Sequence, residues 1–493
     1  MHVQGHAAEV LRSTTDPVSQ GIVAVVIVLV FVVLALEKAH RVLVIFGAVA
    51  LLWLITYLTP YKLISFEGAK AALDLNVLFL LAAMMATVGV LKTTGVFEWA
   101  VGRLLQRAGG RPILIQALIA WFTGILSAFA DNVTTVIFVT PMAVEMARLT
   151  GVRPAAYLLP MVMAANIGGT ATLIGDPPNI MIGSGAGLSF MDFIYDLTVP
   201  VLLMMLALEF VSRRWFRQDL SRPAAGPADF PQPRITDPQL LRWSLVISAG
   251  IFIGFVTHSW TGMPVAVPAA VGAAAILIVQ DVLYLKRHRP SHEERTHGLI
   301  QVIEKEIEWP TLSFFAFLFI AVGAAVDTGL IDTLARGLAW VIEAGRTSAG
   351  LSDPGTLLFA ALMICWVSAV LSAFIDNIPF VAVAIPIIAR IAGELHGETE
   401  VLWWALSLGA CLGGNGTAVG ASANVTTIGL AERGGVRITF PDFMRFGAPI
   451  AAMTLVIGST FLSGYVFLGD RVVFLLGLGL VGGIFAGRLV LRR

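Results

Sequence analysis

The sequence predicts an all-α polytopic membrane protein built from two inverted-topology repeats, each with a re-entrant helical hairpin and a discontinuous transmembrane helix. Composition is the first observation behind this fold class. Of the 493 residues 57% are hydrophobic and 13% are charged, and the mean hydropathy is +0.85. Soluble domains carry about 25% charged residues. The second observation is a long segment that occurs twice, which is typical of membrane proteins with internal structural repeats.

The apolar residues are grouped in runs of about the length of 17–25 residues that spans a bilayer as a helix. The lipid bilayer is therefore the expected partner, and no nucleic-acid partner and no enzymatic activity are predicted. Both cysteines fall within apolar stretches, which gives no basis for a disulfide or a thiolate metal site. The clearest runs are 21–36, 42–59, 75–91, 199–212, 243–256, 264–280, 446–466 and 472–487.

The duplicated segment keeps a constant offset of 245 positions without a gap. Trp121 matches Trp366, and the polar pair Asp131-Asn132 matches Asp376-Asn377. The register continues into a glycine-rich stretch, where the following residues match in order: Gly168, Gly169, Thr172, Gly175 and Asn179 with Gly413, Gly414, Thr417, Gly420 and Asn424. Each half therefore carries polar residues and glycines inside apolar surroundings.

The repeat and the Pro-rich stretch between its halves predict the organisation of the chain. Each half contains three spans, a surface helix, a hairpin with the Asp-Asn pair at its tip, a broken span and a closing span. The expected ranges are an N-terminal tail 1–20, repeat 1 at 21–216 (surface helix 95–108, hairpin 112–147, broken helix 154–183), a cytoplasmic linker 217–240, repeat 2 at 241–467 (surface helix 329–345, hairpin 357–392, broken helix 401–431) and an extra C-terminal helix within 471–493.

The predicted topology inverts the second half relative to the first. A hairpin returns to its own side, so each half makes five crossings, and an odd number reverses the orientation. Lys and Arg concentrate on one side of this topology, which the positive-inside rule places in the cytoplasm. We therefore expect an integral protein of the bacterial inner membrane, with the N-terminus outside and the C-terminus in the cytoplasm. The polar loop 286–309 is expected to be a solvated cytoplasmic surface without a chemical role.

The two Asp-Asn pairs are the first candidate for chemistry. An ionisable side chain at membrane depth costs a few kcal/mol, so it usually faces a cavity or an ion. Carboxylate, amide and free carbonyl oxygens at a hairpin tip are ligands suited to a cation such as sodium. The alternative is that Asp131 and Asp376 only cap the second hairpin arms. Their occurrence in equivalent positions of both halves favours an ion site, and one residue can do both.

The glycine-rich stretches predict spans with unwound centres. Glycine permits backbone conformations closed to other residues, and Pro177-Pro178 suits the first turn of a new half-helix. The exposed half-helix ends offer carbonyl groups to cations and N–H groups to anions. The alternative is that the glycines serve only close helix packing. Asp176 corresponds to Ala421, so the two halves cannot bind identically.

These residues resemble the ArsB/NhaD branch of the ion transporter superfamily, and within it the P-protein (pink-eyed dilution) type. The motifs that carry the resemblance are SAFADNVTT, NIGGTATLIGDPPN, SAFIDNIPF and GACLGGNGTAVGASANV. The resemblance extends over residues 20–467 and implies distant kinship with divalent anion/sodium symporters. It implies a homodimer with a scaffold domain and a mobile transport domain that carries both hairpins. In those symporters each tip reads Ser-Asn-Thr, whereas here Asp131 and Asp376 occupy the first position.

The sequence thus predicts a secondary active transporter, with an elevator-type alternating access implied by the resemblance and no cofactor besides a coupling Na⁺ or H⁺. The expected cargo is an inorganic ion or a small anion. The alternatives are a Na⁺/H⁺ antiporter and a passive, chloride-like anion pathway, whereas arsenite efflux, di- or tricarboxylate symport and an intramembrane aspartyl protease are disfavoured. The candidate binding residues are Asp131, Asn132, Thr134, Gly168, Gly169, Thr172, Asp176, Asn179, Asp376, Asn377, Gly413, Gly414, Asn415, Thr417, Ser422 and Asn424, and the Na⁺ ligands among them are Asp131, Asn132, Thr172, Asp376, Asn377 and Thr417.

Overall fold

The first half of the chain is a series of helices interrupted by one hairpin and one break. The computed structural model describes residues 16–36, 39–221, 234–288, 303–395 and 397–490, and these ranges contain helices and no β-strand. The helices of the first half are α2 (Pro17–Ala35), α3 (Arg41–Leu58), α4 (Phe66–Ala72), α5 (Leu75–Thr93), α6 (Val96–Ala108), α7 (Pro112–Ser127), α8 (Asn132–Thr150), α9 (Ala155–Gly169), α10 (Pro177–Ala186), α11 (Phe190–Trp215) and α12 (Arg217–Leu220).

The second half repeats this order, and one further helix follows it. Hairpin arms α18 and α19 correspond to α7 and α8, and the broken pair α20 and α21 corresponds to α9 and α10. The helices are α13 (Pro238–Thr261), α14 (Ala266–His288), α16 (Trp309–Asp327), α17 (Leu330–Ala349), α18 (Asp353–Phe374), α19 (Asn377–Ala392), α20 (Glu400–Gly413), the 3-10 turn η1 (Gly414–Gly416), α21 (Ser422–Arg433), α22 (Phe440–Leu468) and α23 (Asp470–Val490).

Helix length and hydropathy agree with the predicted fold class. Ten helices within the described ranges are long and apolar enough to cross a membrane. Helices α7, α9 and α19 are apolar but shorter. Two of the ten, α8 and α18, are hairpin arms, and each is paired with a shorter arm, α7 or α19. A helix as short as α7, α9 or α19 ends before it has crossed the hydrocarbon core, as a hairpin tip or a broken span requires.

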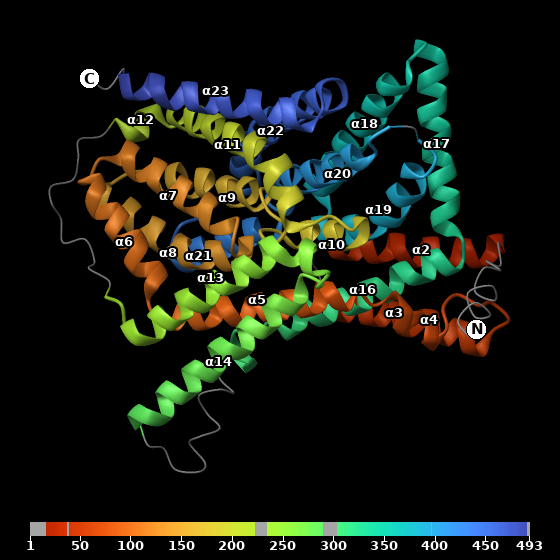
Figure 1. Cartoon of the computed structure of the whole chain (residues 1–493), viewed down its shortest axis with the longest axis horizontal. Helices are drawn as coiled ribbons and strands as arrows, with labels where there is room; N and C mark the ends of the chain where they lie inside the picture. The colour runs from red at the N-terminus through yellow and green to blue at the C-terminus, as the bar shows by residue number, and fades with distance from the viewer. Residues whose placement is uncertain (1–15, 37–38, 222–233, 289–302, 396, 491–493) are drawn as a thin grey trace.

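The helices form two units, which lie one above the other in Figure 1. We call α2–α5, α13, α14 and α16 the scaffold unit, because α16 packs against α2, α3, α4 and α5, and α14 packs against α5 and α13. The hairpin unit consists of α7–α11 and α18–α22. Helices α6 and α17 join the units: each follows a scaffold helix and packs against a hairpin arm.

The two halves are interlocked within the hairpin unit. The first arm of each hairpin packs against the first half-helix of its own half, α7 on α9 and α18 on α20. The second half-helix instead packs against the second hairpin arm of the other half, α21 on α8 and α10 on α19. Both hairpin tips and both breaks are therefore brought to the middle of one unit.

Two helices begin earlier than the sequence predicts, for the same reason. Helix α2 begins at Pro17, inside the predicted tail, and α13 begins at Pro238, inside the predicted linker. In each case an aspartate precedes the proline and accepts hydrogen bonds from the first-turn N–H groups. An N-cap followed by proline favours a helix start. Residues 1–15 of the tail and 222–233 of the linker lie outside the described residues.

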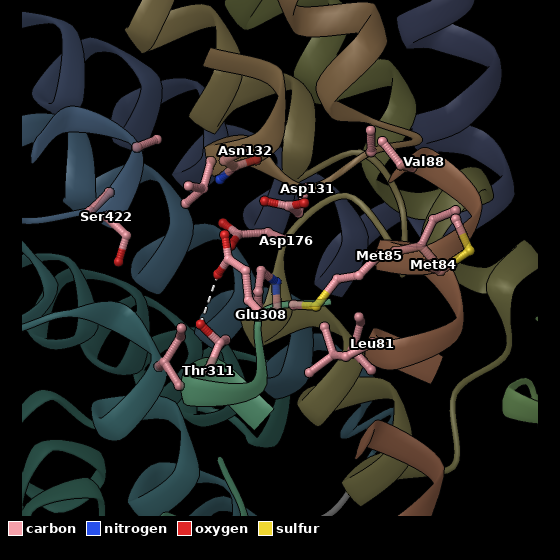
Figure 2. Close-up of a pocket in the computed structure, with 18 of the residues that line it drawn as sticks. Leu81, Met84, Met85, Val88, Asp131, Asn132, Asp176, Glu308, Thr311 and Ser422 are labelled. Atoms are coloured by element: carbon pink, nitrogen blue, oxygen red, sulfur yellow. Dashed lines mark hydrogen bonds between the residues drawn. The ribbon is translucent and has the colours of Figure 1, made fainter. Parts of the chain in front are cut away.

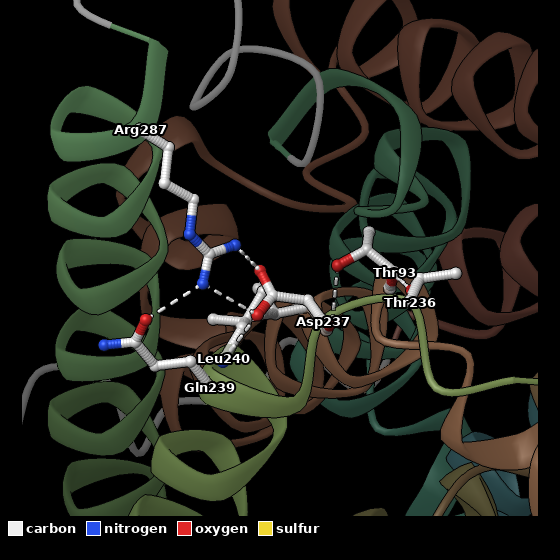
Figure 3. A network of polar contacts seen from close by, with 7 residues as sticks. Thr93, Thr236, Asp237, Gln239, Leu240 and Arg287 are labelled. Atoms are coloured by element: carbon white, nitrogen blue, oxygen red, sulfur yellow. Dashed lines mark hydrogen bonds and ion pairs between the residues drawn. The ribbon is translucent and has the colours of Figure 1, made fainter.

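The start of α13 is also held by polar contacts with α14 and α5 (Figure 3). Arg287 donates to Asp237 at 3.0 Å and to Gln239 at 3.0 Å, and the N–H of Thr236 donates to the Thr94 carbonyl at 2.9 Å. Burial raises the pKa of Asp237, but the hydrogen bonds from Arg287 and Leu240 and the Arg287 charge outweigh it, so the pKa lies below its ordinary value. The contacts stabilise the junction between the described end of the linker and the scaffold unit.

Candidate functional site

Each hairpin tip carries an aspartate immediately before the second arm. Asp131 accepts a hydrogen bond from the Thr134 N–H at 2.9 Å, and the Thr134 hydroxyl also donates to it. Asp376 accepts from the Ile378 N–H at 3.3 Å and from the Ser422 hydroxyl at 3.0 Å. The capping alternative therefore describes the contacts of both carboxylates correctly. A capping carboxylate keeps further lone pairs for a ligand, so the contacts leave the predicted ion site open.

A matched hydrogen bond ties each tip to the unwound segment of its own half. The Thr172 hydroxyl donates to the Ala128 carbonyl, and the Thr417 hydroxyl donates to the Ala373 carbonyl. Thr172 and Thr417, like Ala128 and Ala373, are 245 positions apart, which is the offset of the repeat. Thr172 and Thr417 are predicted Na⁺ ligands. Each hydroxyl donates its proton to a carbonyl of the tip, and its oxygen keeps lone pairs that a cation can bind.

Asn179 and Asn424 hold the two breaks in shape. The side-chain amide of Asn179 donates to three carbonyl groups of the first break at 3.0–3.4 Å, and that of Asn424 donates to two carbonyl groups of the second at 2.8 and 2.9 Å. The Asn179 side-chain oxygen also accepts from the Ser407 hydroxyl at 2.7 Å. Both side chains are fully buried. They satisfy carbonyl groups that the interrupted helices leave without partners.

The predicted site glycines allow backbones to approach closely. A Cβ on Gly168 would lie 2.0 Å from a carbonyl oxygen of α7, and one on Gly413 would lie 2.4 Å from a carbonyl oxygen of α18. A Cβ on Gly169 would lie 2.3 Å from the side-chain oxygen of Asn132, and one on Gly414 would lie 2.9 Å from a carbonyl oxygen across its break. The packing alternative therefore accounts for Gly168 and Gly413, which place the breaks against the hairpins.

Four buried asparagines meet where the two halves join. Asn166 accepts from the Asn132 amide at 3.3 Å and donates to the side-chain oxygens of Asn415 at 2.8 Å and Asn424 at 3.1 Å. The sequence analysis missed Asn166, because its counterpart in the repeat is Cys411 and the duplication therefore does not mark it. Among the described residues the Asn415 side-chain nitrogen has no hydrogen-bond partner.

Substitution of Asn166 tests whether this junction stabilises the hairpin unit. We expect Asn166→Ala to lower the thermal stability of the protein in detergent, because it leaves buried amide groups without partners at about 1–3 kcal/mol each. Cys411→Ala removes the side chain at the equivalent position of the other half, which takes no part in the asparagine junction and whose Sγ contacts Asn179 at 3.7 Å and also Asp176. A melting temperature of Asn166→Ala no lower than that of Cys411→Ala would show that the asparagine contacts are not stabilising.

A small cavity lies beside the first tip, between the two units (Figure 2). We call it the site cavity. Its volume is about 60 Å³, which is room for a few water molecules. The hairpin unit lines it with five residues that the sequence predicts as ligands, namely Asp131, Asn132, Asp176, Asn377 and Ser422. These residues come from both halves of the chain, so the structure brings the halves together at one cavity.

Asp176 is the most buried carboxylate of the site cavity. Only 3% of its surface is exposed, and the Asn377 amide of the other half approaches it at 3.5 Å. Ala421, the counterpart of Asp176, lines the same cavity without a polar group. The two halves therefore differ at this cavity, since the first half contributes the carboxylate of Asp176 and the second half contributes the methyl group of Ala421.

The scaffold unit contributes three polar residues that the sequence analysis missed. Arg41 from the start of α3, Glu308 immediately before α16 and Thr311 on its first turn also line the site cavity. Loop 286–309 was expected to be a solvated surface without a chemical role. Its residues 289–302 lie outside the described part of the chain, and Glu308 at its end lines the site cavity. No duplicated motif marks these residues, and only tertiary packing brings them to the tips.

A second, larger cavity adjoins the first. Its volume is about 500 Å³, and it shares Arg41, Glu308 and Ser422 with the site cavity. Asp376 lines this adjacent cavity and not the site cavity. The remaining predicted site residues line neither cavity: Thr134, Gly168, Gly169, Thr172, Asn179, Gly413, Gly414, Asn415, Thr417 and Asn424.

The structure limits the kind of cation site that these residues can form. Within the described ranges, no three His, Cys, Asp or Glu side chains come together as a metal-binding group. A hard cation such as sodium takes oxygen ligands of any kind, including amide, hydroxyl and backbone carbonyl oxygens. The Na⁺ assignment therefore stays a prediction that depends on mixed oxygen ligands and not on a cluster of carboxylates alone.

Two re-entrant hairpins, two broken helices and a small cavity with carboxylate and amide groups from both halves define a secondary transporter of the inverted-repeat class. Residues 31–409 match the CitMHS citrate transporter family, which is more than half of the chain. The chain therefore belongs to the CitMHS family, and the resemblance that the sequence motifs indicate is confirmed.

Curated relatives agree with this membership, and a solved structure shares the fold. An uncharacterized transporter of Mycobacterium tuberculosis is 35% identical over 447 residues, covering 90% of this chain and 97% of the relative. The P protein of pig is 28% identical over 519 residues, covering 90% of this chain and 59% of the relative. The YdaH transporter of Alcanivorax borkumensis, whose crystal structure has an unusual topology, superimposes with a TM-score of 0.60 at 15% identity, covering 87% of this chain and 99% of that structure.

Proposed function

We propose that this protein is a secondary active transporter that couples a Na⁺ or H⁺ gradient to the movement of an inorganic ion or a small anion. One observation carries the proposal: the carboxylates of Asp131 and Asp176 in the first half line a single small cavity, and Asn377 of the other half completes it. Carboxylates held at membrane depth take up a proton or a cation more readily than they remain charged and alone. The occupant neutralises them and permits the hairpin unit to move.

We propose an elevator-type movement, in which the hairpin unit slides against the scaffold unit. The boundary between the units supports this. The site cavity and the adjacent cavity lie on it near the beginnings of α3 and α16. A further groove of about 1220 Å³ lies on the same boundary near the ends of these helices, between Asp327 of α16 and Ile385 of α19. Open space therefore lies on both sides of the hairpin tips along this boundary. Alternating access between the two faces of the membrane requires such space.

A Na⁺/H⁺ antiporter is the second candidate, and the contents of the site cavity favour it. The cavity has the volume of a few water molecules and carries carboxylates from both units. A partly dehydrated cation fits this space and this charge. Citrate, which the family description names, carries three carboxylates, and the charge of Asp131 and Asp176 repels it unless a cation or proton neutralises them.

The arrangement in the membrane is also proposed. The excess of Lys and Arg at one predicted face supports a cytoplasmic C-terminus and an external N-terminus. Bacterial relatives support the inner membrane as the location. The four candidate spans with the smallest share of buried residues, α2, α3, α13 and α14, belong to the scaffold unit. A homodimer formed through this unit would leave the hairpin unit free to move.

Flux measurements on the wild-type protein test the proposal. Purified protein in proteoliposomes receives an inward Na⁺ gradient, and ²²Na⁺ uptake and the lumenal pH reported by pyranine are recorded. We expect saturable ²²Na⁺ uptake, and lumenal alkalinisation in addition if the protein is an antiporter. Current that reverses at the chloride equilibrium potential, without dependence on Na⁺ or pH, would instead establish a passive anion pathway.

A further inference from the structure

The scaffold residues of the site cavity form a short polar chain at the N-terminus of α16. The Arg41 guanidinium donates to the Thr311 hydroxyl at 2.7 Å, and that hydroxyl donates to the Glu308 carboxylate at 2.8 Å. Arg41 also lies over the Phe314 ring at 5.7 Å. The Thr311 hydroxyl therefore links one positive and one negative side chain, and both of these line the site cavity and the adjacent cavity.

The site cavity has more acidic than basic side chains. Asp131, Asp176 and Glu308 all line it, against the single positive charge of Arg41. None of these four side chains takes part in an ion pair among the described residues. Figure 2 shows the carboxylates of Glu308 and Asp176 directed toward the same space, with Asp131 next to them. The cavity therefore attracts a cation, and one of its three carboxylates belongs to the scaffold unit.

We infer that Glu308 gives the sodium site a higher affinity for Na⁺ when the site faces one side of the membrane than when it faces the other. The inference rests on the proposed function, because it needs a hairpin unit that moves. In the state described here, a cation beside Asp131 and Asp176 also faces Glu308. When the hairpin unit slides away, its two aspartates travel with it and Glu308 stays with α16. The cation then loses the attraction of one carboxylate.

Arg41 has the opposite effect in the same state. Its positive charge lies beside the same cavity and opposes the binding of a cation. It stays behind with α3 just as Glu308 stays with α16. The difference in cation affinity between the two faces is therefore set by two scaffold residues of opposite sign, and neither of them travels with the cargo.

The charge-neutral variants of these residues should act in opposite directions and on one face only. We expect Glu308→Gln to raise the KM for sodium about tenfold, which corresponds to about 1.4 kcal/mol of lost attraction, when ²²Na⁺ is supplied to the face at which α3 and α16 begin. Arg41→Gln should lower that KM several-fold. Neither variant should change the KM measured from the opposite face.

Everted and right-side-out membrane vesicles separate the two faces. The KM of ²²Na⁺ uptake is measured in both kinds for the wild type, Glu308→Gln, Arg41→Gln and Glu306→Gln. Glu306 is the matched control: it precedes Glu308 by two residues, pairs with Lys92 at 3.0 Å and lines neither the site cavity nor the adjacent cavity. Melting temperatures in detergent check that all variants are folded.

The outcomes separate this inference from the proposed function. Opposite shifts for Glu308→Gln and Arg41→Gln, confined to one kind of vesicle, support the inference. Equal shifts in both kinds of vesicle, shifts of the same sign or no shift relative to Glu306→Gln overturn it while sodium transport stands. Absence of ²²Na⁺ flux from the wild type in both kinds of vesicle overturns sodium coupling and this inference together.

Discussion

Asp131→Asn and Asp376→Asn are each expected to reduce cation-dependent flux to the level of liposomes without protein. The reason is the loss of charge and not the loss of structure. Both aspartates cap a hairpin arm through hydrogen bonds from backbone N–H groups, and asparagine caps a helix about as well as aspartate does. The substituted tips should therefore keep their fold, while the carboxylate that we propose as a ligand of the coupling ion is gone.

The measurement is the initial rate of ²²Na⁺ uptake into proteoliposomes, together with the pyranine signal. Asp16→Asn is the matched control, because Asp16 caps α2 in the same way and lines neither the site cavity nor the adjacent cavity. Asp131 lines the site cavity with Asp176, and Asp376 lines only the adjacent cavity. Wild-type rates in both tip variants would remove the coupling role from both carboxylates and leave them as helix caps.

The residues at the hairpin tips and breaks could be predicted because their chemistry is local and occurs twice. A single proline does not end a helix in this protein, since Pro141 and Pro160 lie inside α8 and α9. Several glycines or prolines next to a polar residue inside an apolar span do favour a break. The repeat at constant offset shows that both halves carry the same pattern. The matched Thr172 and Thr417 contacts show this equivalence at the level of single atoms. The inverted arrangement followed from counting crossings, since a hairpin adds none.

The rest of the site could not be predicted, because it depends on packing between distant segments. Glu308 and Arg41 are ordinary charged residues near helix starts, and nothing in their local sequence indicates a cavity. Asn166 differs in kind, since it lies within the glycine-rich motif but its partner in the repeat is a cysteine. The roles of Thr172, Thr417, Asn179 and Asn424 also required the structure, because a polar side chain that holds a backbone and one that holds an ion have the same sequence signature.

Gly168→Ala is expected to have the largest effect on stability. The added methyl group would lie 2.0 Å from the Gly124 carbonyl oxygen and 2.6 Å from the Gly124 Cα atom. Both are backbone atoms, so no side chain can turn away, and helices α7 and α9 must separate. Overpacking of this kind costs about 1–3 kcal/mol or more, and here it also moves the first tip from its break. We therefore expect a lower melting temperature in detergent and a loss of flux.

Gly429→Ala provides the control for Gly168→Ala. Gly429 lies in α21, where an added Cβ would meet nothing within 4 Å. Alanine in the interior of a helix is about 1 kcal/mol more favourable than glycine, so this variant should melt no lower than the wild type. Gly413→Ala should resemble Gly168→Ala, because its Cβ would lie 2.4 Å from the Ala369 carbonyl oxygen of the other hairpin. If Gly168→Ala and Gly429→Ala had the same melting temperature, the fold would not require the close contact between the hairpin and the break. The polar contacts alone would then have to fix the positions of the tip carboxylates.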